Sequence, residues 1–266
     1  MKFPGLILGA VIAGALIGGP AAAVTREEAT IENALVVLRE LQSMPDLQIP
    51  DQLLARAEGI VILPANVKVG LIFGARFGNG VLLVRNANRD WSNPVFVTTG
   101  GGSWGFQVGG QVADIVLVLT TPRSIEGITD GKLTLGADAS VSAGPVGRTA
   151  MASTSLTFDS EVYAYSRSKG LFAGVSLEGN GVFIGRKANR RFYDGEDSAA
   201  AIIAQTTAPP PPADELVAAV RRMTSATQRV PAENAEPAAV AVPTEKPVEA
   251  ARTYPLPDPE PGAEPR

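Results

Sequence analysis

A row of short apolar or alternating runs, separated by clusters of glycine, is the feature that most constrains the fold. Most of the 28 glycines lie between Gly59 and Gly195. Runs of this length bounded by glycine are typical of strands and tight turns. We therefore predict the α+β class, with a Gly-rich, mostly antiparallel twisted sheet or partial barrel flanked by N-terminal and C-terminal helices. The expected strands are residues 60–63, 67–73, 81–84, 95–99, 104–108, 112–119, 133–139, 153–158, 162–166, 171–177 and 182–184.

Local signals add one turn and several helices to this sheet. The dipeptide Asn79-Gly80 between two apolar runs predicts a hairpin turn. Thr25 followed three residues later by Glu28 is the pattern of a helix capping box. The helix that it begins has an acidic polar face, so we expect it to pack on the body rather than lie in a membrane interface. Helices are predicted over residues 25–43, 51–57, 124–128, 198–206 and 214–225.

The two ends of the chain differ in composition from the body. Lys2, an apolar run from Gly5 to Ile17 and a small-residue site at Ala21-Ala22-Ala23 are typical of a signal peptide. We predict a signal peptide over residues 1–23 with cleavage after Ala23, although residues 3–24 are long enough to span a bilayer as an uncleaved anchor. The predicted body is 24–206, followed by a Pro-rich linker with a short helix (207–227) and a disordered Pro/Ala/Glu-rich tail (228–266). The expected location is periplasmic, or peripheral on the envelope membrane.

The absence of both cysteine and histidine restricts the chemistry of the chain. A thiolate nucleophile, an imidazole base and a Cys/His metal site are all excluded. No spacing of oxygen ligands indicates a metal site either. We therefore expect no enzyme activity, no cofactor and no metal. The carboxylates that could act in catalysis are Asp114, Asp138, Asp159 and Glu161. Asp114 and Asp138 lie in apolar, Gly-rich surroundings, and we expect them to be buried structural acids that need an arginine or hydrogen-bond donors.

Three short patterns resemble catalytic or nucleotide-binding motifs. Residues 101–105 fit the G-x-S-x-G nucleophile elbow around Ser103, but the elbow requires a histidine base and a strand-to-helix turn. The glycines of residues 100–105 also fit a dinucleotide fingerprint, without the helix that should follow. Ser166-x-x-Lys169 fits a serine acyl-transferase motif that lacks its partner motifs. A serine hydrolase remains only a remote alternative.

Basic side chains are concentrated in the C-terminal half of the body. Residues 51–195 carry 14 basic and 11 acidic side chains, an excess too small to indicate nucleic-acid binding. Clustered cations at turns can hold lipid phosphates, and solvated turn charges are an equally good interpretation. If the turns around residues 167–169 and 186–187 lie at one end of the sheet, their four cations face one surface. The candidate lipid-binding residues are Arg148, Arg167, Lys169, Arg186, Lys187, Arg190 and Arg191.

The body resembles the SYLF domain, the lipid-binding and actin-binding domain of eukaryotic SH3-containing endocytic proteins. The matching segments are residues 57–64, 78–85, 100–108, 136–148, 165–177 and 188–193. The resemblance implies lipid binding, with phosphatidylinositol lipids among the ligands in eukaryotes, and actin-filament binding in some members. It also implies membrane contact through an amphipathic N-terminal helix and basic residues.

Two hypotheses of function follow from the residues and the resemblance. The first is a non-enzymatic phospholipid-binding module of the bacterial cell envelope, where anionic phospholipids replace phosphoinositides. The second is a protein-interaction or scaffold module in the periplasm, with an envelope protein partner that contacts the tail. For an exported protein, actin is not expected as a partner.

Overall fold

The computed structural model describes residues 24–43, 48–70, 73–104, 109–145, 158–168, 171–175 and 177–225. These residues belong to one compact unit that extends to residue 230. The predicted signal peptide, nearly all of the predicted strand 153–158 and the predicted disordered tail lie outside the described residues.

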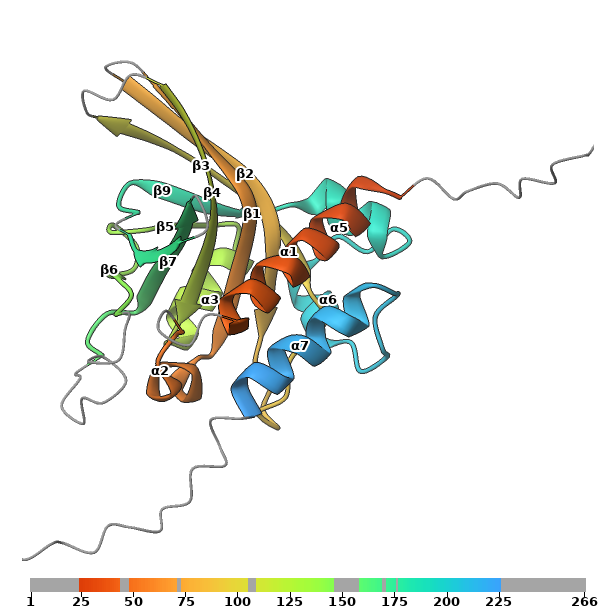
Figure 1. The fold of residues 1–266 in the computed structure, drawn as a ribbon. Helices are drawn as coiled ribbons and strands as arrows, with labels where there is room; N and C mark the ends of the chain where they lie inside the picture. The colour runs from red at the N-terminus through yellow and green to blue at the C-terminus, as the bar shows by residue number, and fades with distance from the viewer. Residues whose placement is uncertain are drawn as a thin grey trace, which may run out of the picture. The chain divides into compact units, whose positions relative to one another are not determined.

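One curled sheet of nine strands forms the centre of the fold (Figure 1). The strand order is β5-β9-β3-β2-β1-β4-β7-β6, and β8 pairs with β7. Every pairing is antiparallel except that of β6 with β7, so the predicted α+β class and mostly antiparallel sheet are confirmed. The strands are β1 (Gly59–Gly70), β2 (Phe73–Val84), β3 (Val95–Trp104), β4 (Gly109–Leu119), β5 (Lys132–Thr134), β6 (Val141–Ala143), β7 (Val162–Ser168), β8 (Leu171–Gly174) and β9 (Asn180–Ile184).

The hairpin predicted at Asn79-Gly80 is wrong, because β2 runs through both residues without a turn. Gly80 lies instead opposite an irregularity in β1, where the register shifts between Ile62 and Val67. A Cβ atom on Gly80 would lie 2.0 Å from the carbonyl oxygen of Ile62. The glycine therefore allows two backbones to approach closely, which is the other common role of glycine within a strand.

The five predicted helices are present, with ends that differ by a few residues. The capping box is confirmed, since Thr25 N–H donates to Glu28 Oε2 at 2.7 Å and Glu28 N–H donates to Thr25 Oγ1 at 3.1 Å. One further helix, α5, was not predicted. The helices are α1 (Arg26–Ser43), α2 (Asp51–Arg56), α3 (Pro122–Thr129), α5 (Arg186–Phe192), α6 (Ala199–Ala204) and α7 (Ala213–Ser225).

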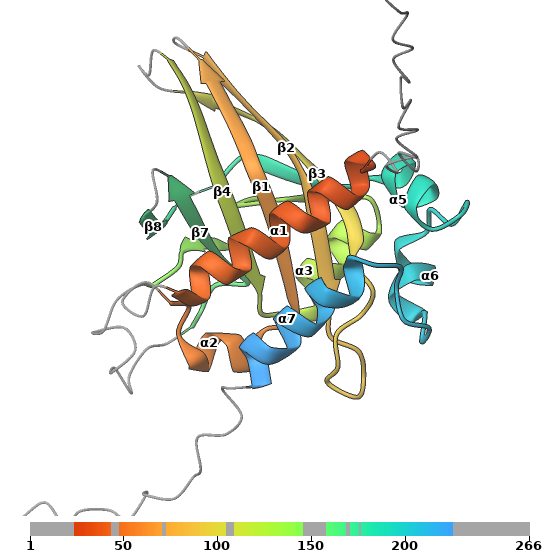
Figure 2. The same ribbon diagram turned by 45° about the vertical axis from the view of Figure 1, so that its right-hand side comes forward.

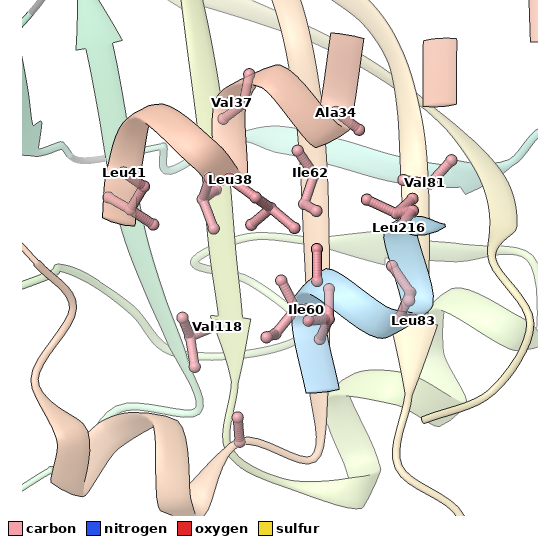
Figure 3. Close-up of a cluster of buried hydrophobic side chains, with 14 of the residues drawn as sticks. Ala34, Val37, Leu38, Leu41, Ile60, Ile62, Val81, Leu83, Val118 and Leu216 are labelled. Atoms are coloured by element: carbon pink, nitrogen blue, oxygen red, sulfur yellow. The ribbon is translucent and has the colours of Figure 1, made fainter. Parts of the chain in front are cut away.

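The two faces of the sheet bury separate hydrophobic clusters. On one face, α1 packs across β1 and β2, as Figure 3 shows for Leu38, Ile62 and Val81. The predicted packing of this helix on the body is thereby confirmed. On the opposite face, Leu82, Leu117 and neighbouring side chains pack with Ile128 of α3.

Helix α7 completes the cluster on the α1 face. Its side chain Leu216 is fully buried, and Arg221 forms two hydrogen bonds, of 2.8 and 2.9 Å, with the carboxylate of Asp90. Trp91 Nε1–H donates to Thr224 Oγ1 at 2.9 Å. The hydrophobic cluster under α1 therefore includes side chains of α7.

The far ends of β1–β4 extend beyond α1 (Figures 1 and 2). We call residues 66–70, 73–78, 100–104 and 109–113 the projecting sheet end. In the part of the chain that the structure describes, no helix is long and apolar enough to cross a membrane.

Candidate functional site

Four of the seven predicted lipid-binding cations lie on the short helix α5: Arg186, Lys187, Arg190 and Arg191. The sequence places this helix directly after β9, and two polar side chains fix it to β3. Asn189 Oδ1, which is buried, accepts the backbone N–H of Phe96 at 2.7 Å. The Tyr193 hydroxyl donates to the carbonyl oxygen of Pro94 at 2.7 Å. These two hydrogen bonds fix the position of α5, and with it the position of its cations.

A groove of about 470 Å³ lies between α5 and the first turn of α1. Its cations are Arg26 from α1 and Arg186, Lys187 and Arg191 from α5, and its single carboxylate is Glu27. We call it the cationic groove. Its remaining lining is uncharged. It consists of Thr30 of α1, Asn79 of β2, Phe96, Val97 and Thr98 of β3, Ile184 of β9, and Gly185 and Ala188 at the start of α5.

Glu27 connects the two helices that form the groove. Its carboxylate is buried and accepts hydrogen bonds from Arg191. Burial alone would raise the pKa of Glu27, but the hydrogen bonds and the charge of Arg191 outweigh burial and lower that pKa overall. The acid therefore stays ionised and forms its ion pair with Arg191, and its charge also interacts with that of Arg26. The other three cations of the groove, Arg26, Arg186 and Lys187, are not ion-paired with it.

These three cations differ in their contacts. Arg186 lies 3.8 Å from Asp197, a long ion pair between side chains that are largely or partly exposed. Within the described residues, Arg26 and Lys187 form no ion pair. An anion that enters the groove can thus meet three cations without first displacing a close carboxylate.

The remaining predicted cations lie elsewhere. Arg190 is paired with Asp197 and does not line the groove. Arg148 and Lys169 lie outside the described residues. Arg167 is on β7, where it binds Asp114 at 2.7 Å and also pairs with Glu40 in the last turns of α1.

The structure does not place the segments around residues 167 and 186 as two basic turns on one surface. Arg167 lies within a strand and Arg186 begins a helix, so neither is a turn residue. Their partners on α1, Glu40 for Arg167 and Glu27 for the α5 cluster, are 13 residues apart, or about 20 Å along a helix. Of the predicted cations that the structure describes, Arg186, Lys187 and Arg191 therefore line one groove, and Arg167 and Arg190 do not.

Arg26 is the groove residue that sequence reasoning missed. It precedes Glu27 and Glu28 in a segment whose overall charge is acidic, so nothing local indicates a role in anion binding. Its position in the groove depends on the contact between Glu27 and Arg191, which are 164 residues apart in the chain.

The candidates for catalysis have structural roles in the fold. Asp114 accepts the Ala65 N–H at 2.9 Å and Arg167 Nε–H at 2.8 Å, and Asp138 accepts the Thr134 N–H at 2.6 Å. These contacts are those of structural acids, but the expected burial is wrong for Asp138, which is exposed, and Asp114 is only partly buried. The segment around Ser103 belongs to strand β3, not to a strand-to-helix elbow. Among the described residues, no three His, Cys, Asp or Glu side chains are grouped as a metal site would require.

Comparison with known proteins gives a family match over nearly half of the chain. Residues 100–223 match the Ysc84 family, described as Las17-binding protein actin regulator. The match includes α5 but not Arg26.

Three relatives illustrate the extent of the similarity. The chain is 36% identical over 168 residues to human SH3 domain-containing YSC84-like protein 1. This alignment covers 61% of this chain and 49% of the human protein. The chain is 42% identical over 151 residues to Protein YSC84 of Saccharomyces cerevisiae, covering 56% and 32%. The same identity and length relate it to LAS seventeen-binding protein 3 of that yeast, covering 56% and 33%. The chain thus spans a third to a half of the length of these relatives.

Proposed function

The chain contains a SYLF domain, the domain also named Ysc84, and we propose that it is a non-enzymatic module that binds anionic phospholipid at a membrane surface. The observation that supports this most directly is the cationic groove, in which Arg26, Arg186 and Lys187 converge beside a single, already paired carboxylate. A phosphate headgroup has the charge and the acceptor oxygens that such a set of donors recognises.

The number of available cations favours this surface over the surface around Arg167. Each cation close to an anionic bilayer contributes about 1 kcal/mol at modest ionic strength. Three cations together would support reversible binding that weakens steeply with salt. The surface at the C-terminal end of α1 offers less, because Arg167 is already paired with Asp114 and Glu40.

A charge-matched pair of triple variants tests the groove. In the first, Arg26, Arg186 and Lys187 are changed to Gln; in the control, Arg123, Lys132 and Arg222, which lie outside the groove, are changed to Gln. Flotation with phosphatidylcholine vesicles, with and without one third phosphatidylglycerol, measures binding. We expect the groove variant to lose at least about tenfold in affinity for anionic vesicles and most of its salt dependence.

The outcomes separate the groove from net charge. Equal losses in the two variants would mean that overall charge, not this site, drives binding. Binding that does not distinguish anionic from neutral vesicles would contradict the proposed function itself. Circular dichroism of both variants checks that the fold is intact, as exposed charges contribute little to stability.

We also propose that the protein acts in the cell envelope. The signal-like pattern of residues 1–23 supports this location. Fractionation of cells that express the full chain, with N-terminal sequencing of the product, tests it. Recovery of an uncleaved chain from the cytoplasm would contradict an envelope role.

A protein partner is the second candidate function, favoured by the name of one yeast relative, LAS seventeen-binding protein 3, and by the description of the matched family as Las17-binding. On this hypothesis the tail beyond residue 228 contacts an envelope protein while the body supplies a second contact. Crosslinking in an envelope extract would show one abundant partner that is lost when the tail is deleted. An exported chain would not meet actin, so actin remains outside this proposal.

A further inference from the structure

The projecting sheet end exposes an unusually apolar face. Val69, Phe77 and Val112 are 41, 51 and 59% exposed, and they are three of the five large apolar side chains that are exposed among the described residues. Strand register places them together, because Val67 pairs with both Phe77 and Val112. Directly paired residues project on the same side of a sheet, so the side chains form one apolar patch.

This patch lies on the same face of the sheet as α1. Phe77 precedes Val81 by four residues in β2, and Val112 precedes Val116 by four in β4. Val81 and Val116 both pack in the cluster under α1. Since side chains two and four residues apart share a face, the apolar patch continues the α1 face beyond the helix that covers it.

The patch is also contiguous with the cationic groove. Asn79 lines the groove, and Phe77 is two residues further along β2 on the same face, about 7 Å away. On the neighbouring strand, Thr98 lines the groove and pairs with Asn79, while Gly100 pairs with Phe77. Glycine leaves the face open between the groove and the patch.

The charged residues of the projecting sheet end indicate what kind of partner binds the apolar patch. The described residues of the projecting sheet end contain two cations, Lys68 and Arg76, and no carboxylate. Lys68 pairs with Arg76 across β1 and β2, on the face opposite to Val67 and Phe77. An element with one apolar face and one cationic face suits the boundary between headgroups and acyl chains of an anionic membrane.

We propose that the projecting sheet end enters the interface of an anionic phospholipid bilayer, with Val67, Val69, Phe77 and Val112 against the acyl chains. This inference rests on the proposed function, because the same membrane supplies the headgroups that occupy the cationic groove. The cationic groove then binds the headgroups at the membrane surface, and the neighbouring apolar patch contacts the acyl chains beneath them.

Single cysteine labels test this arrangement, and the cysteine-free chain makes each label unique. Full-length Val69→Cys, Phe77→Cys and Val112→Cys variants carry an environment-sensitive fluorophore, and Ala55→Cys on α2, before the opposite end of β1, is the control. Vesicles of phosphatidylcholine with one third phosphatidylglycerol are added, with brominated acyl chains in a parallel sample. We expect blue-shifted emission and bromine quenching at the three patch positions and neither change at the control.

A second variant measures the contribution to affinity without a label. Changing Phe77 and Val112 together to Ser should weaken binding to the same vesicles by about tenfold, because their apolar area would no longer leave water. Val36→Ser removes an exposed apolar side chain of α1 and should leave affinity nearly unchanged. Equal losses in these two variants would overturn the assignment of the patch.

The remaining outcomes are distinguishable. Normal flotation with anionic vesicles but silent patch labels would overturn the inference and leave the proposed function standing. No flotation above that with phosphatidylcholine alone would reject the proposed function and the inference with it. A label change without vesicles that grows with protein concentration would show that the patch is an interface between copies of the chain, and would also overturn the inference.

Discussion

Among the strand glycines whose surroundings the structure describes, Gly80 is the one whose replacement the fold tolerates least. A Cβ atom there would meet the Ile62 carbonyl at 2.0 Å and Leu63 Cδ2 at 2.8 Å, whereas at Gly102 its nearest neighbour would be 3.9 Å away. We expect Gly80→Ala to lower the free energy of unfolding by about 3 kcal/mol or more. Gly102→Ala should stay within about 1 kcal/mol of the parent protein. Urea unfolding of the two variants makes the comparison, and similar stabilities would mean that β1 can move away from Gly80.

Glu27 opposes anion binding while it supports the fold, so its removal should act in two directions. Glu27→Gln takes the only carboxylate out of the cationic groove and releases Arg191. We expect affinity for anionic vesicles to rise about fivefold, the effect of one added charge near the surface. The melting temperature should fall, because α1 loses its ion pair to α5. Glu126→Gln on α3, which removes the same charge outside the groove, should change neither quantity appreciably.

The acid sensitivity of the fold has a defined sign. Hydrogen bonds and charge from Arg221 are the main cause that lowers the pKa of Asp90, and Arg191 lowers that of Glu27 against the effect of burial. A carboxylate whose folded pKa is depressed stabilises the protein above its unfolded pKa, and this contribution is lost as the pH falls through the folded value. Melting temperature should therefore decline on acidification below about pH 4.5, with a weaker decline in Glu27→Gln/Asp90→Asn. Parallel curves for the two proteins would rule out these pairs as the cause.

At the scale of elements, α7 shields the hydrophobic cluster under α1 from solvent. Leu216 is fully buried against α1 and β2, while Val36 on the outer side of α1 is 45% exposed. Leu216→Ala should cost about 3 kcal/mol of stability, and Val36→Ala less than about 0.5 kcal/mol. Denaturant unfolding measures both. A small effect at Leu216 would indicate that α7 is dispensable for the body.

The elements that sequence predicted are those with strong local signals. The capping residues and apolar stripe of α1 suffice to place that helix, and the glycine-bounded runs suffice for most strands. Helix α5 was missed because its seven residues are too few to show a helical period, and its apolar Ala188 and Phe192 are only one turn apart.

Sites formed by residues that are far apart in the chain could not be predicted from local sequence patterns. The sequence identified the cations of α5, but Arg26 joins them only through the fold. Arg167 was predicted to bind lipid, and nothing near it in the chain indicates Asp114 or Glu40, which are 53 and 127 residues away. Asn79-Gly80 has the composition of a hairpin turn, but β2 continues through it. The glycine is needed there because β1 has a bulge opposite it, between Ile62 and Val67, and the local sequence does not indicate that bulge.

At the scale of the whole molecule, charge is divided between body and tail. Residues 231–266 carry seven carboxylates and three basic side chains, a net charge of −4 that equals the formal charge of the entire chain. Residues 1–230 are therefore formally neutral, with cations and carboxylates in equal number. Any attraction to an anionic membrane must come from the local arrangement of those cations, as in the groove, and the tail adds only repulsion.

Removing residues 231–266 should therefore strengthen binding to vesicles with one third phosphatidylglycerol, by about threefold at low ionic strength. The gain should vanish in 1 M salt, where the Debye length is only about 3 Å. Because the last described element, α7, ends at Ser225 and is kept in the shortened chain, the melting temperature should not change. Phosphatidylcholine vesicles are the control and should bind both proteins alike. Weaker binding after the deletion would contradict the electrostatic argument and assign the tail a direct contact with lipid.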